Sequence, residues 1–356
     1  GAGFGGGGAG GTGGFDAGAG VSALMAVVDG TCFERGVHGG PDALGTPRFD
    51  FSTNSNSVGP CPHALAAAQQ ADATCYPDPQ YTALRAQLAA FHGVDGARVV
   101  LAASASEFIF RTSALHALHR GQGVCLPPHH YGDYAQAAQA WGLPKASAAD
   151  AALLWACEPS SPLGQQQVDL AAWVDGLRVG QQLVLDCAYA PLRLSGAPSL
   201  DAAQMDRLWQ LYTPNKALGL TGIRAAYAIA PLGVDTTPLQ ALCPSWPVGA
   251  HGVAMLEAWC QPGVQQWLAQ SLQTLRTWKA RQVAMLEDLG WACLPSEANF
   301  FCARPPWDDL PRSLHSLRGK GIKLRDTTSF GLPGLVRLGV LPPAAQDTLA
   351  RAIMQV

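Results

Sequence analysis

Short apolar runs alternate with helical patterns along the middle of the chain. Residues 99–101, 124–126, 152–155 and 183–185 are continuous apolar runs that lead into polar residues, glycine or proline. Fully buried parallel strands have this texture, and helices between them supply the crossovers that a parallel sheet needs. The pattern therefore predicts an α/β fold with a mainly parallel sheet.

Two of the intervening helices are marked by their ends. Residues 79–91 place leucines and a phenylalanine on one helical face, and His92-Gly93 follows as a stop signal. Ser104 and Glu107 have the spacing of a capping box, with the serine at the N-cap and the glutamate at the third helical position. A second helix is therefore predicted to begin just after the strand at 99–101.

The texture of the chain changes beyond residue 245. Residues 255–289 have a long helical pattern interrupted near Pro262, and strand patterns follow around 298–301 and 335–340. We predict a smaller C-terminal domain here, completed by residues 49–54 from the N-terminal side. The expected organisation is a glycine-rich tail (1–35), an arm that joins the small domain and the site (36–62), a large domain (63–245) and a small domain (246–356).

Composition narrows the class of protein. The chain has 356 residues, of which 48% are apolar and 14% charged, so most of it should fold around a core and not stay disordered. A net charge of −3 provides no electrostatic footprint for nucleic acid or an anionic membrane surface, and no apolar run is long enough to span a bilayer. Ten scattered cysteines without zinc-ligand spacing favour a cytoplasmic protein without a metal site.

Three residues are candidates for chemistry on their own context. Lys216 stands among small and apolar residues, where a desolvated amine would be a good imine-forming nucleophile. A surface lysine on a loop fits that context equally well. Asp186 follows the run 183–185, which predicts that its carboxylate lies at the carboxyl end of a parallel strand, where open α/β sheets bind ligands. Tyr189 is expected to reach the same crevice.

An ordered series of short motifs extends from about His38 to the end of the chain. With this series the chain resembles the pyridoxal-phosphate enzymes of the class I/II aminotransferase fold, in the branch that holds histidinol-phosphate aminotransferase and the threonine-phosphate decarboxylase of cobalamin synthesis. The motifs are His38-Gly39-Gly40, Asn54-Ser55-Asn56, Tyr76-Pro77-Asp78, Ala105-Ser106-Glu107, Tyr131-Gly132, residues 159–164, Asp186-Cys187-Ala188-Tyr189, Asn215-Lys216 with Arg224, Ala298-Asn299-Phe300, and Arg325 with Arg337.

The resemblance implies fold type I, with a large domain on a mainly parallel sheet and a smaller α/β C-terminal domain, and pyridoxal 5'-phosphate as cofactor. It implies that Lys216 binds the cofactor aldehyde as a Schiff base and then moves the proton of the substrate Cα. Asp186 would pair with the ring nitrogen and keep it protonated, and Tyr189 would hydrogen-bond the phenolic oxygen.

The resemblance also assigns the remaining cofactor contacts. The phosphate would lie at the N-terminus of the helix opened by Ser104, where backbone N–H groups and the helix dipole favour an anion. Backbone donors would come from Ala105, Ser106 and Glu107, side-chain donors from Thr213 and Asn215, and positive charge from Arg224. Tyr131 would stack on the pyridine ring; a core aromatic residue is the simpler alternative for it.

Partners and substrates follow from the same resemblance. Tyr76 would reach the phosphate of a neighbouring subunit's cofactor, which implies a homodimer, although a tyrosine in a turn would look the same. Arg337, inside an apolar strand, would clamp the substrate α-carboxylate with its planar donors. Arg325 would bind a phosphate or another acidic tail, unless it is a solvated surface residue, and Asn56 is a further candidate for substrate binding.

Three positions depart from the family pattern. Ser161 stands where relatives usually carry the asparagine that donates to the phenolic oxygen of the cofactor, Cys187 replaces a common glutamate, and Asn215 replaces a common serine. Serine can still donate one hydrogen bond there, and loss of a neutral donor costs only on the order of 1 kcal/mol. We therefore expect the altered chain to bind the cofactor.

Three functions are compatible with these residues. The first is an aminotransferase that acts on an α-amino acid and a 2-oxo acid. The second is a decarboxylase of a phosphorylated amino acid, which His38-Gly39-Gly40 and the polar loop through Asn56 favour. The third is a non-catalytic sensor that keeps the fold, as in regulators fused to a DNA-binding head. The glycine-rich first 35 residues lack the core and basic charge of such a head.

Overall fold

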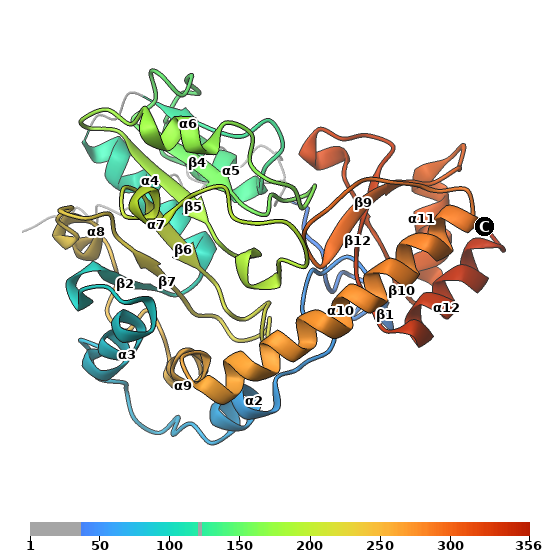
Figure 1. Ribbon diagram of the computed structural model, residues 1–356, viewed down its shortest axis with the longest axis horizontal. Helices are drawn as coiled ribbons and strands as arrows, with labels where there is room; N and C mark the ends of the chain where they lie inside the picture. Colours follow the sequence, from blue (N-terminus) through green and yellow to red (C-terminus); the bar gives the residue numbers. More distant parts are fainter. Residues whose placement is uncertain (1–36, 120–122) are drawn as a thin grey trace, which may run out of the picture. The chain divides into compact units, whose positions relative to one another are not determined.

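A six-stranded mixed sheet forms the core of the larger part of the protein (Figure 1). The computed structural model describes residues 37–119 and 123–356, so the predicted glycine-rich tail lies outside the described residues. The strand order is β2-β7-β6-β5-β4-β3, and β3 to β6 run parallel while β7 is antiparallel to both of its neighbours. The strands are β2 (Val99–Ala102), β3 (Val124–Cys125), β4 (Leu153–Cys157), β5 (Gln182–Asp186), β6 (Trp209–Tyr212) and β7 (Ala226–Ile229).

Helices cover both faces of this sheet, because successive side chains of a strand point to opposite sides. Trp155 of β4 packs with residues of α4 (Ala105–Leu118), α5 (Gly132–Ala140) and α8 (Thr237–Ala241). The next side chain towards the N-terminus, Leu154, packs with α6 (Leu170–Asp175) on the other face. The remaining helical segments of this part are α2 (Pro62–Gln69), α3 (Thr82–His92), α7 (Ala202–Met205), α9 (Ala250–Trp259), η1 (Gly96–Arg98) and η2 (Ala190–Leu192).

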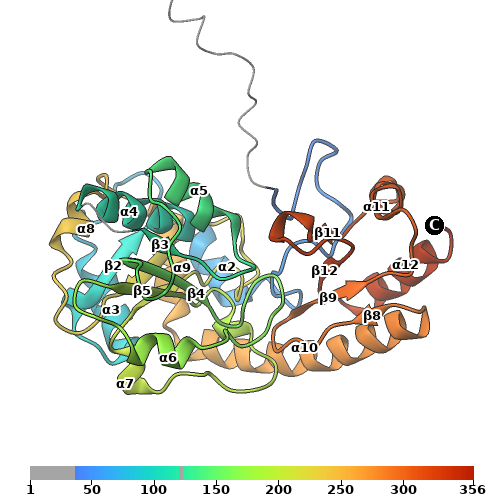
Figure 2. The same ribbon diagram turned by 90° about the horizontal axis from the view of Figure 1, so that it is seen from above.

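A second, four-stranded antiparallel sheet has the order β11-β12-β9-β8. Its strands are β8 (Ala292–Cys293), β9 (Phe300–Arg304), β11 (Arg325–Asp326) and β12 (Val336–Gly339). The segments around it are α10 (Pro262–Asp288), α11 (Leu310–Gly319), α12 (Pro343–Ile353) and η3 (Thr328–Phe330). The long helix α10 contacts α2 and α9 near its start and β8 and α12 further along, so it joins the two sheets (Figures 1 and 2).

The N-terminal arm belongs to the same part of the fold as the C-terminal sheet. β1 (Phe49–Asp50) pairs in parallel with β10 (Ile322–Lys323), and the Gly339 N–H of β12 donates to the Phe51 carbonyl at 2.7 Å. Residues 49–51 thus pair with the C-terminal part, which supports the prediction that residues 49–54 complete the small domain; the predicted division into tail, arm and two domains stays a prediction. The arm is what brings Asn54 and Asn56 to the carboxyl edge of the large sheet.

The predicted helix boundaries are mostly confirmed. α3 ends at Gly93, whose φ of +65° suits glycine. It begins at Thr82 and not at residue 79, because Tyr81 has a positive φ and the Asp78 carboxylate accepts from the Thr82 N–H.

The break near Pro262 separates α9 from α10, as predicted. The boundary between the large and the small domain at residues 245 and 246 stays a prediction. The helix α9 follows this boundary, yet it contacts α2 and α3, which precede it in the chain. None of the described helices combines the length and the apolar character that a membrane crossing needs.

Candidate functional site

The candidate site lies at the carboxyl edge of the six-stranded sheet. Asp186 is the last residue of β5, and Lys216 lies in the loop that connects β6 to β7. β5 and β6 are parallel neighbours, with Asp186 opposite Leu211, so the loop after β6 begins beside the aspartate. This arrangement puts both groups where open α/β sheets bind their ligands.

The Asp186 carboxylate is buried and held by two donors. The Tyr134 hydroxyl donates to its Oδ2 at 2.6 Å, and the Ala188 N–H donates to its Oδ1 at 2.9 Å. Burial raises the pKa of Asp186, while the Tyr134 hydrogen bond, the Ala188 hydrogen bond and the charge of Lys216 act against that rise. Lys216 is thus close enough to act on Asp186 electrostatically, yet no ion pair joins the two within the described part of the chain.

Tyr189 lies between the lysine and the arm. The Lys216 Nζ is 5.5 Å from the centre of the Tyr189 ring, and the Asn54 Nδ2 donates to the Tyr189 hydroxyl at 3.1 Å. The edge of Phe300, from the C-terminal sheet, packs against the same ring. The three residues predicted to be catalytic therefore lie together, and Asn54 adds a contact that comes from the arm.

Asn56 supports the lysine loop. Its Nδ2 donates to the Ala217 carbonyl at 3.0 Å and to the Ser271 hydroxyl at 2.8 Å, and its own N–H donates to the Lys216 carbonyl at 2.9 Å. The Asn56 amide thus binds the backbone next to Lys216 and the Ser271 hydroxyl of α10. A direct role of Asn56 in substrate binding stays a prediction.

The N-terminus of α4 faces the same edge of the sheet. The Ser104 hydroxyl accepts from the Glu107 N–H at 3.1 Å, which confirms the predicted N-cap. The reciprocal half of the predicted capping box is wrong: the Glu107 carboxylate accepts from the Ala103 N–H and pairs with Arg111. Glu107 turns to Arg111 because the two residues lie one helical turn apart on α4 and form an i,i+4 ion pair. The cap also occupies the Glu107 N–H.

The other residues predicted to bind the phosphate differ in how far they are buried. The Thr213 Oγ1 and the Asn215 Oδ1 are buried, and the Asn215 Nδ2 donates to the carbonyls of Thr221 and Ile223. Arg224, eight residues beyond Lys216, is exposed. The cofactor roles of Ala105, Ser106, Glu107, Thr213, Asn215 and Arg224 stay predictions.

Buried polar atoms without a partner are concentrated at this site. Across the described ranges twelve such side-chain atoms occur, and five of them belong to residues of the site: Asn54 Oδ1, Thr213 Oγ1, Asn215 Oδ1, Asn299 Oδ1 and Arg337 Nε. Buried polar atoms normally have partners, so this concentration indicates a polar ligand. A flat, phosphorylated pyridine aldehyde fits the set, since it offers hydrogen-bonding groups around its rim and an aldehyde for Lys216.

Two buried arginines face each other on neighbouring strands of the C-terminal sheet. Arg337 of β12 lies opposite Arg325 of β11. The Arg337 guanidinium donates to the Ser161 hydroxyl and to the Ser52 carbonyl, each at 3.1 Å, and lies over the rings of Phe300 and Phe330. Ser161, expected to meet the cofactor, thus contacts the arginine predicted to bind substrate. Its contact with the cofactor stays a prediction.

Arg325 uses more of its donors within the protein. It donates to the Val37 carbonyl at 2.5 Å, to the Ser329 hydroxyl at 2.8 Å and to the Asp326 carbonyl. Burial, together with the charge of Arg337, lowers the pKa of Arg325 to about 10. Neither arginine forms an ion pair with a carboxylate in the region that the structure covers. Two adjacent buried cations are costly, which indicates an anionic ligand.

The two tyrosines predicted to contact a cofactor, Tyr131 and Tyr76, have different surroundings. Tyr131 precedes α5, its hydroxyl is 3.2 Å from the Ser106 hydroxyl, and the His38 ring is 5.9 Å from its own. Tyr76 is 77% exposed and stacks on Trp246. The stacking role of Tyr131 and the contribution of Tyr76 to another subunit stay predictions.

Sequence reasoning missed Tyr134 and Ser52. Tyr134 lies three residues after Tyr131, and residues three apart share one face of a helix, so the Tyr131 motif could have indicated it. Ser52 acts through its backbone carbonyl, for which the side-chain sequence carries no signal. The hydrogen bond from Tyr134 of α5 to Asp186 of β5 forms only when the two elements pack together, so the sequence alone does not show it.

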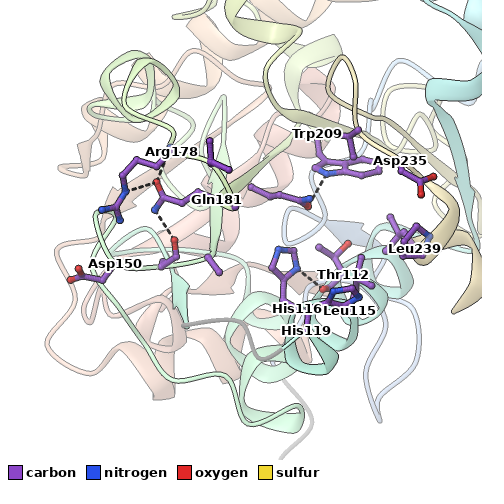
Figure 3. A pocket seen from close by; sticks show the side chains of 17 residues that line it. Thr112, Leu115, His116, His119, Asp150, Arg178, Gln181, Trp209, Asp235 and Leu239 are labelled. Carbon is purple, nitrogen blue, oxygen red and sulfur yellow. Dashed lines mark hydrogen bonds between the residues drawn. The ribbon is translucent and has the colours of Figure 1, made fainter.

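A separate cavity of about 640 Å³ lies at the opposite, amino edge of the sheet (Figure 3). It is lined by the end of α4, the starts of β5 and β6, and α8, with His116, Gln182 and Trp209 among its residues. The His116 Nδ1 is bound to the Thr112 carbonyl of its own helix, and burial lowers the pKa of His116. The strands separate this cavity from Asp186 and Lys216, so it is not part of the candidate site. Groups of three potential metal ligands are absent from the described ranges.

Comparison with known proteins gives a consistent family. A family model described as aminotransferase class I and II matches residues 46–353. The histidinol-phosphate aminotransferase 1 of Thiobacillus denitrificans is 30% identical over 318 residues, which cover 82% of this chain and 80% of that protein. The histidinol-phosphate aminotransferase of Jannaschia sp. is 28% identical over 317 residues, which cover 82% and 87%.

Solved structures show the same fold. The histidinol-phosphate aminotransferase of Sinorhizobium meliloti, in complex with pyridoxal-5'-phosphate, superposes with a TM-score of 0.73 at 21% identity and covers 85% of this chain and 90% of its own. The L-threonine-O-3-phosphate decarboxylase of Porphyromonas gingivalis superposes with a TM-score of 0.71 at 20% identity, covering 86% and 98%.

Proposed function

The chain belongs to the class I and II aminotransferase family, and we propose that it transfers the amino group of an α-amino acid with a second acidic group to a 2-oxo acid, with Lys216 and Asp186 at the centre of the site. Pyridoxal 5'-phosphate is the cofactor. The observation that carries the proposal is that Asp186 ends β5 and Lys216 lies in the loop after β6, the parallel neighbour of β5, so that the two groups are near each other without forming an ion pair.

When bound, the cofactor withdraws electrons from the substrate Cα and so makes its proton acidic. Lys216 would hold the cofactor aldehyde through its Nζ, and the same amine would move the proton at the substrate Cα. The Asp186 carboxylate would stabilise a positive charge on the ring nitrogen, because a buried anion is best satisfied by a cation. Tyr189, whose hydroxyl accepts from Asn54, would donate to the phenolic oxygen.

The arginine pair supports a substrate with two anionic groups. Arg337 has donors left on its Nε, and it is fixed in place by Ser161 and Ser52, as a bidentate carboxylate clamp requires. Arg325 lies beside it and would attract the second acidic group, although several of its donors bind the arm. A phosphate or a side-chain carboxylate has the required charge.

One observation favours the decarboxylase of a phosphorylated amino acid as a second candidate. The segment His38-Gly39-Gly40, which is part of the resemblance to that enzyme, packs against Ser52. The Gly40 N–H donates to the Ser52 hydroxyl at 2.8 Å, and the Ser52 carbonyl holds Arg337. The motif therefore contributes to the proposed carboxylate clamp, whose orientation decides whether the proton or the carboxylate leaves the Cα.

A single experiment separates these functions. The cofactor-loaded protein is incubated, without a second substrate, with a panel of amino acids that includes phosphorylated and dicarboxylic members. An aminotransferase releases one equivalent of 2-oxo acid for each site, whereas a decarboxylase releases carbon dioxide catalytically. Lys216→Ala is the control for both. A wild-type protein that takes up no pyridoxal phosphate would rule out both enzymes and leave the sensor.

We further propose a homodimer in which Tyr76 reaches the cofactor of the partner subunit. The high exposure of Tyr76 and its stacking on Trp246 support this assignment. A cytoplasmic location remains part of the proposal. It is supported by the nine cysteines of the described ranges, all of which are free.

A further inference from the structure

Among the described residues, Tyr134 is the one whose side chain forms a hydrogen bond to the Asp186 carboxylate, and it lies outside the predicted set. Its hydroxyl donates to Asp186 Oδ2 at 2.6 Å, a length typical of a strong hydrogen bond between a hydroxyl and a charged oxygen. Burial and the nearby Asp186 charge raise the pKa of Tyr134 well above its usual value, so the phenol keeps the proton that it donates to the carboxylate. We propose that Tyr134 is a positioning residue that keeps the Asp186 carboxylate ionised and aligned for the ring nitrogen of the cofactor.

The need for such a donor follows from the burial of Asp186. A carboxylate away from water tends to take up a proton, and a neutral acid cannot hold a positive charge on the cofactor ring. Two donors oppose this tendency, the Tyr134 hydroxyl on one oxygen and the Ala188 N–H on the other. The Ala188 amide belongs to the same turn as Asp186, so only Tyr134 fixes the carboxylate relative to another element of the fold.

The Tyr134 ring is held in place on several sides. It is fully buried, stacks on Trp155 of β4 with centroids 4.7 Å apart, and meets Tyr131 edge-on at 5.8 Å. Its hydroxyl therefore has little freedom to leave Asp186. The Tyr134 ring also contacts Tyr131, which is the residue predicted to stack on the pyridine face. Tyr131 and Tyr134, at the start of α5, would thus position groups at two sides of the cofactor ring.

The other titratable groups near Asp186 are one lysine, two thiols and a second tyrosine. Lys216, from the loop after β6, favours the ionised form, whereas the thiols of Cys157 on β4 and Cys187 beside Asp186 have pKa values raised by burial and stay neutral. Tyr131 has a raised pKa and also stays neutral. Lys216 becomes part of the cofactor linkage, which leaves the Tyr134 hydroxyl as the side-chain contact that is unchanged when the cofactor binds.

The first test uses the protein without cofactor. The infrared band of a protonated carboxyl is followed from about pH 5 to pH 9 in wild type and in Tyr134→Phe, and Asp186→Asn identifies the contribution of Asp186. We expect Tyr134→Phe to raise the midpoint of Asp186 ionisation by about one to two pH units, the size of one hydrogen bond to a charged group. Tyr227→Phe is the matched control, because its buried hydroxyl binds His92 and Trp259 and not Asp186.

A second variant covers the case in which Tyr134→Phe does not fold. A 3-fluorotyrosine placed at position 134 keeps the ring and makes the phenol a stronger donor, so the midpoint should move downward. Coincident midpoints for wild type and both variants would overturn the proposal and reduce Tyr134 to a packing residue.

The third measurement is made on the cofactor-loaded enzyme, since the proposal rests on the proposed function. In Tyr134→Phe the pH profile of kcat should move with the infrared midpoint while KM for the amino donor stays within about twofold, because the substrate clamp is elsewhere. An unmoved profile in an enzyme that binds pyridoxal phosphate would overturn the role of Tyr134 and leave the proposed function intact. Failure of the wild type to bind pyridoxal phosphate would overturn both.

Discussion

Arg337 shows how single residues of this site depend on contacts from distant parts of the chain. Its guanidinium is held by Ser52 from the arm and Ser161 from the loop after β4, so three segments that are far apart in the sequence build one clamp. A planar fork held in this way suits a carboxylate, and a lysine amine cannot reproduce its geometry.

Replacement of Arg337 tests the clamp. Arg337→Lys keeps a positive charge but loses the bidentate geometry, so we expect kcat/KM for the amino donor to fall by about tenfold to a thousandfold, mainly through KM. Steady-state kinetics measure this change, and pyridoxal phosphate affinity serves as the internal control. An unchanged KM would show that the substrate carboxylate is bound elsewhere.

The substitution Ser161→Asn tests the position at which this chain carries a serine and its relatives usually carry an asparagine. The longer amide would reach further towards the cofactor and would have to share the space that the Arg337 guanidinium now uses. If Ser161 serves mainly to fix Arg337, the substitution raises KM for the donor by several-fold and leaves cofactor affinity within about threefold. Equilibrium titration with pyridoxal phosphate and steady-state kinetics separate the two effects. Tighter cofactor binding at constant KM would contradict this interpretation.

The N-terminal arm is the element on which the site depends most. Within the arm, Gly39 lies so close to Ser52 that an added Cβ would lie 2.2 Å from the Ser52 carbonyl oxygen, which is the same oxygen that accepts from Arg337. A backbone contact of this kind cannot be relieved by a side-chain rotation.

Gly39→Ala should therefore act on the clamp through the arm. We expect a rise of about tenfold or more in KM for the amino donor, because the Ser52 carbonyl has to move and Arg337 loses a fixed partner. Gly45→Ala is the matched control for a glycine substitution in the arm, since its Cβ would meet nothing within 4 Å, although its positive φ adds some strain. Equal effects of the two variants would contradict the proposed link between Gly39 and Arg337.

At the scale of the whole molecule, the proposed homodimer makes a prediction about mixed subunits. Lys216→Ala and Tyr76→Ala should each be impaired alone. When the two are mixed and allowed to exchange subunits, a mixed dimer contains one site with both an intact lysine and an intact tyrosine from its partner. Activity should therefore reappear on mixing, and light scattering should give twice the mass of the chain. No recovery in a protein that exchanges subunits would place Tyr76 outside the partner's site.

The half-buried histidine His92 predicts how the free energy of unfolding depends on pH. Burial lowers the pKa of His92 to about 4 from 6.5, and its Nε2 is 2.8 Å from the Tyr227 hydroxyl. As the pH falls below 6.5 the unfolded chain takes up a proton that the folded chain refuses, so stability decreases until about pH 4 and then levels off. The integrated loss from this group is up to about 3 kcal/mol.

Urea denaturation between pH 7 and pH 4 measures this loss. His92→Phe should flatten the profile, although burial also lowers the pKa of His116 and His130 and these two histidines keep a smaller slope in the same direction. A variant profile that runs parallel to the wild type would show that His92 is not buried neutral.

Local patterns in the sequence were sufficient for the class of fold. The apolar runs predicted β2 to β5 to within two residues at each end, because buried strands leave an uninterrupted apolar signal. The run at 99–101 was predicted as a parallel strand, whereas β2 pairs antiparallel with β7 at the edge of the sheet. The antiparallel strand β7 was not predicted, since its pairing direction depends on how the lysine loop turns back and not on its own residues. Local context singled out Lys216, Asp186 and Tyr189, family resemblance added Arg337, and the structure brings these residues to one edge of the sheet and one facing strand.

By itself, then, the sequence determined the class of fold and the family, and it supplied the residues that we propose carry the chemistry. Only the tertiary structure decided that Tyr134 donates to Asp186, that Ser52 and Ser161 hold Arg337, and that the Asn56 amide supports the lysine loop. The physical reason is the range of each interaction. Hydrophobic periodicity and helix caps are local and therefore legible along the chain, whereas these hydrogen bonds join atoms separated by tens to hundreds of residues and exist only when packing brings their elements together.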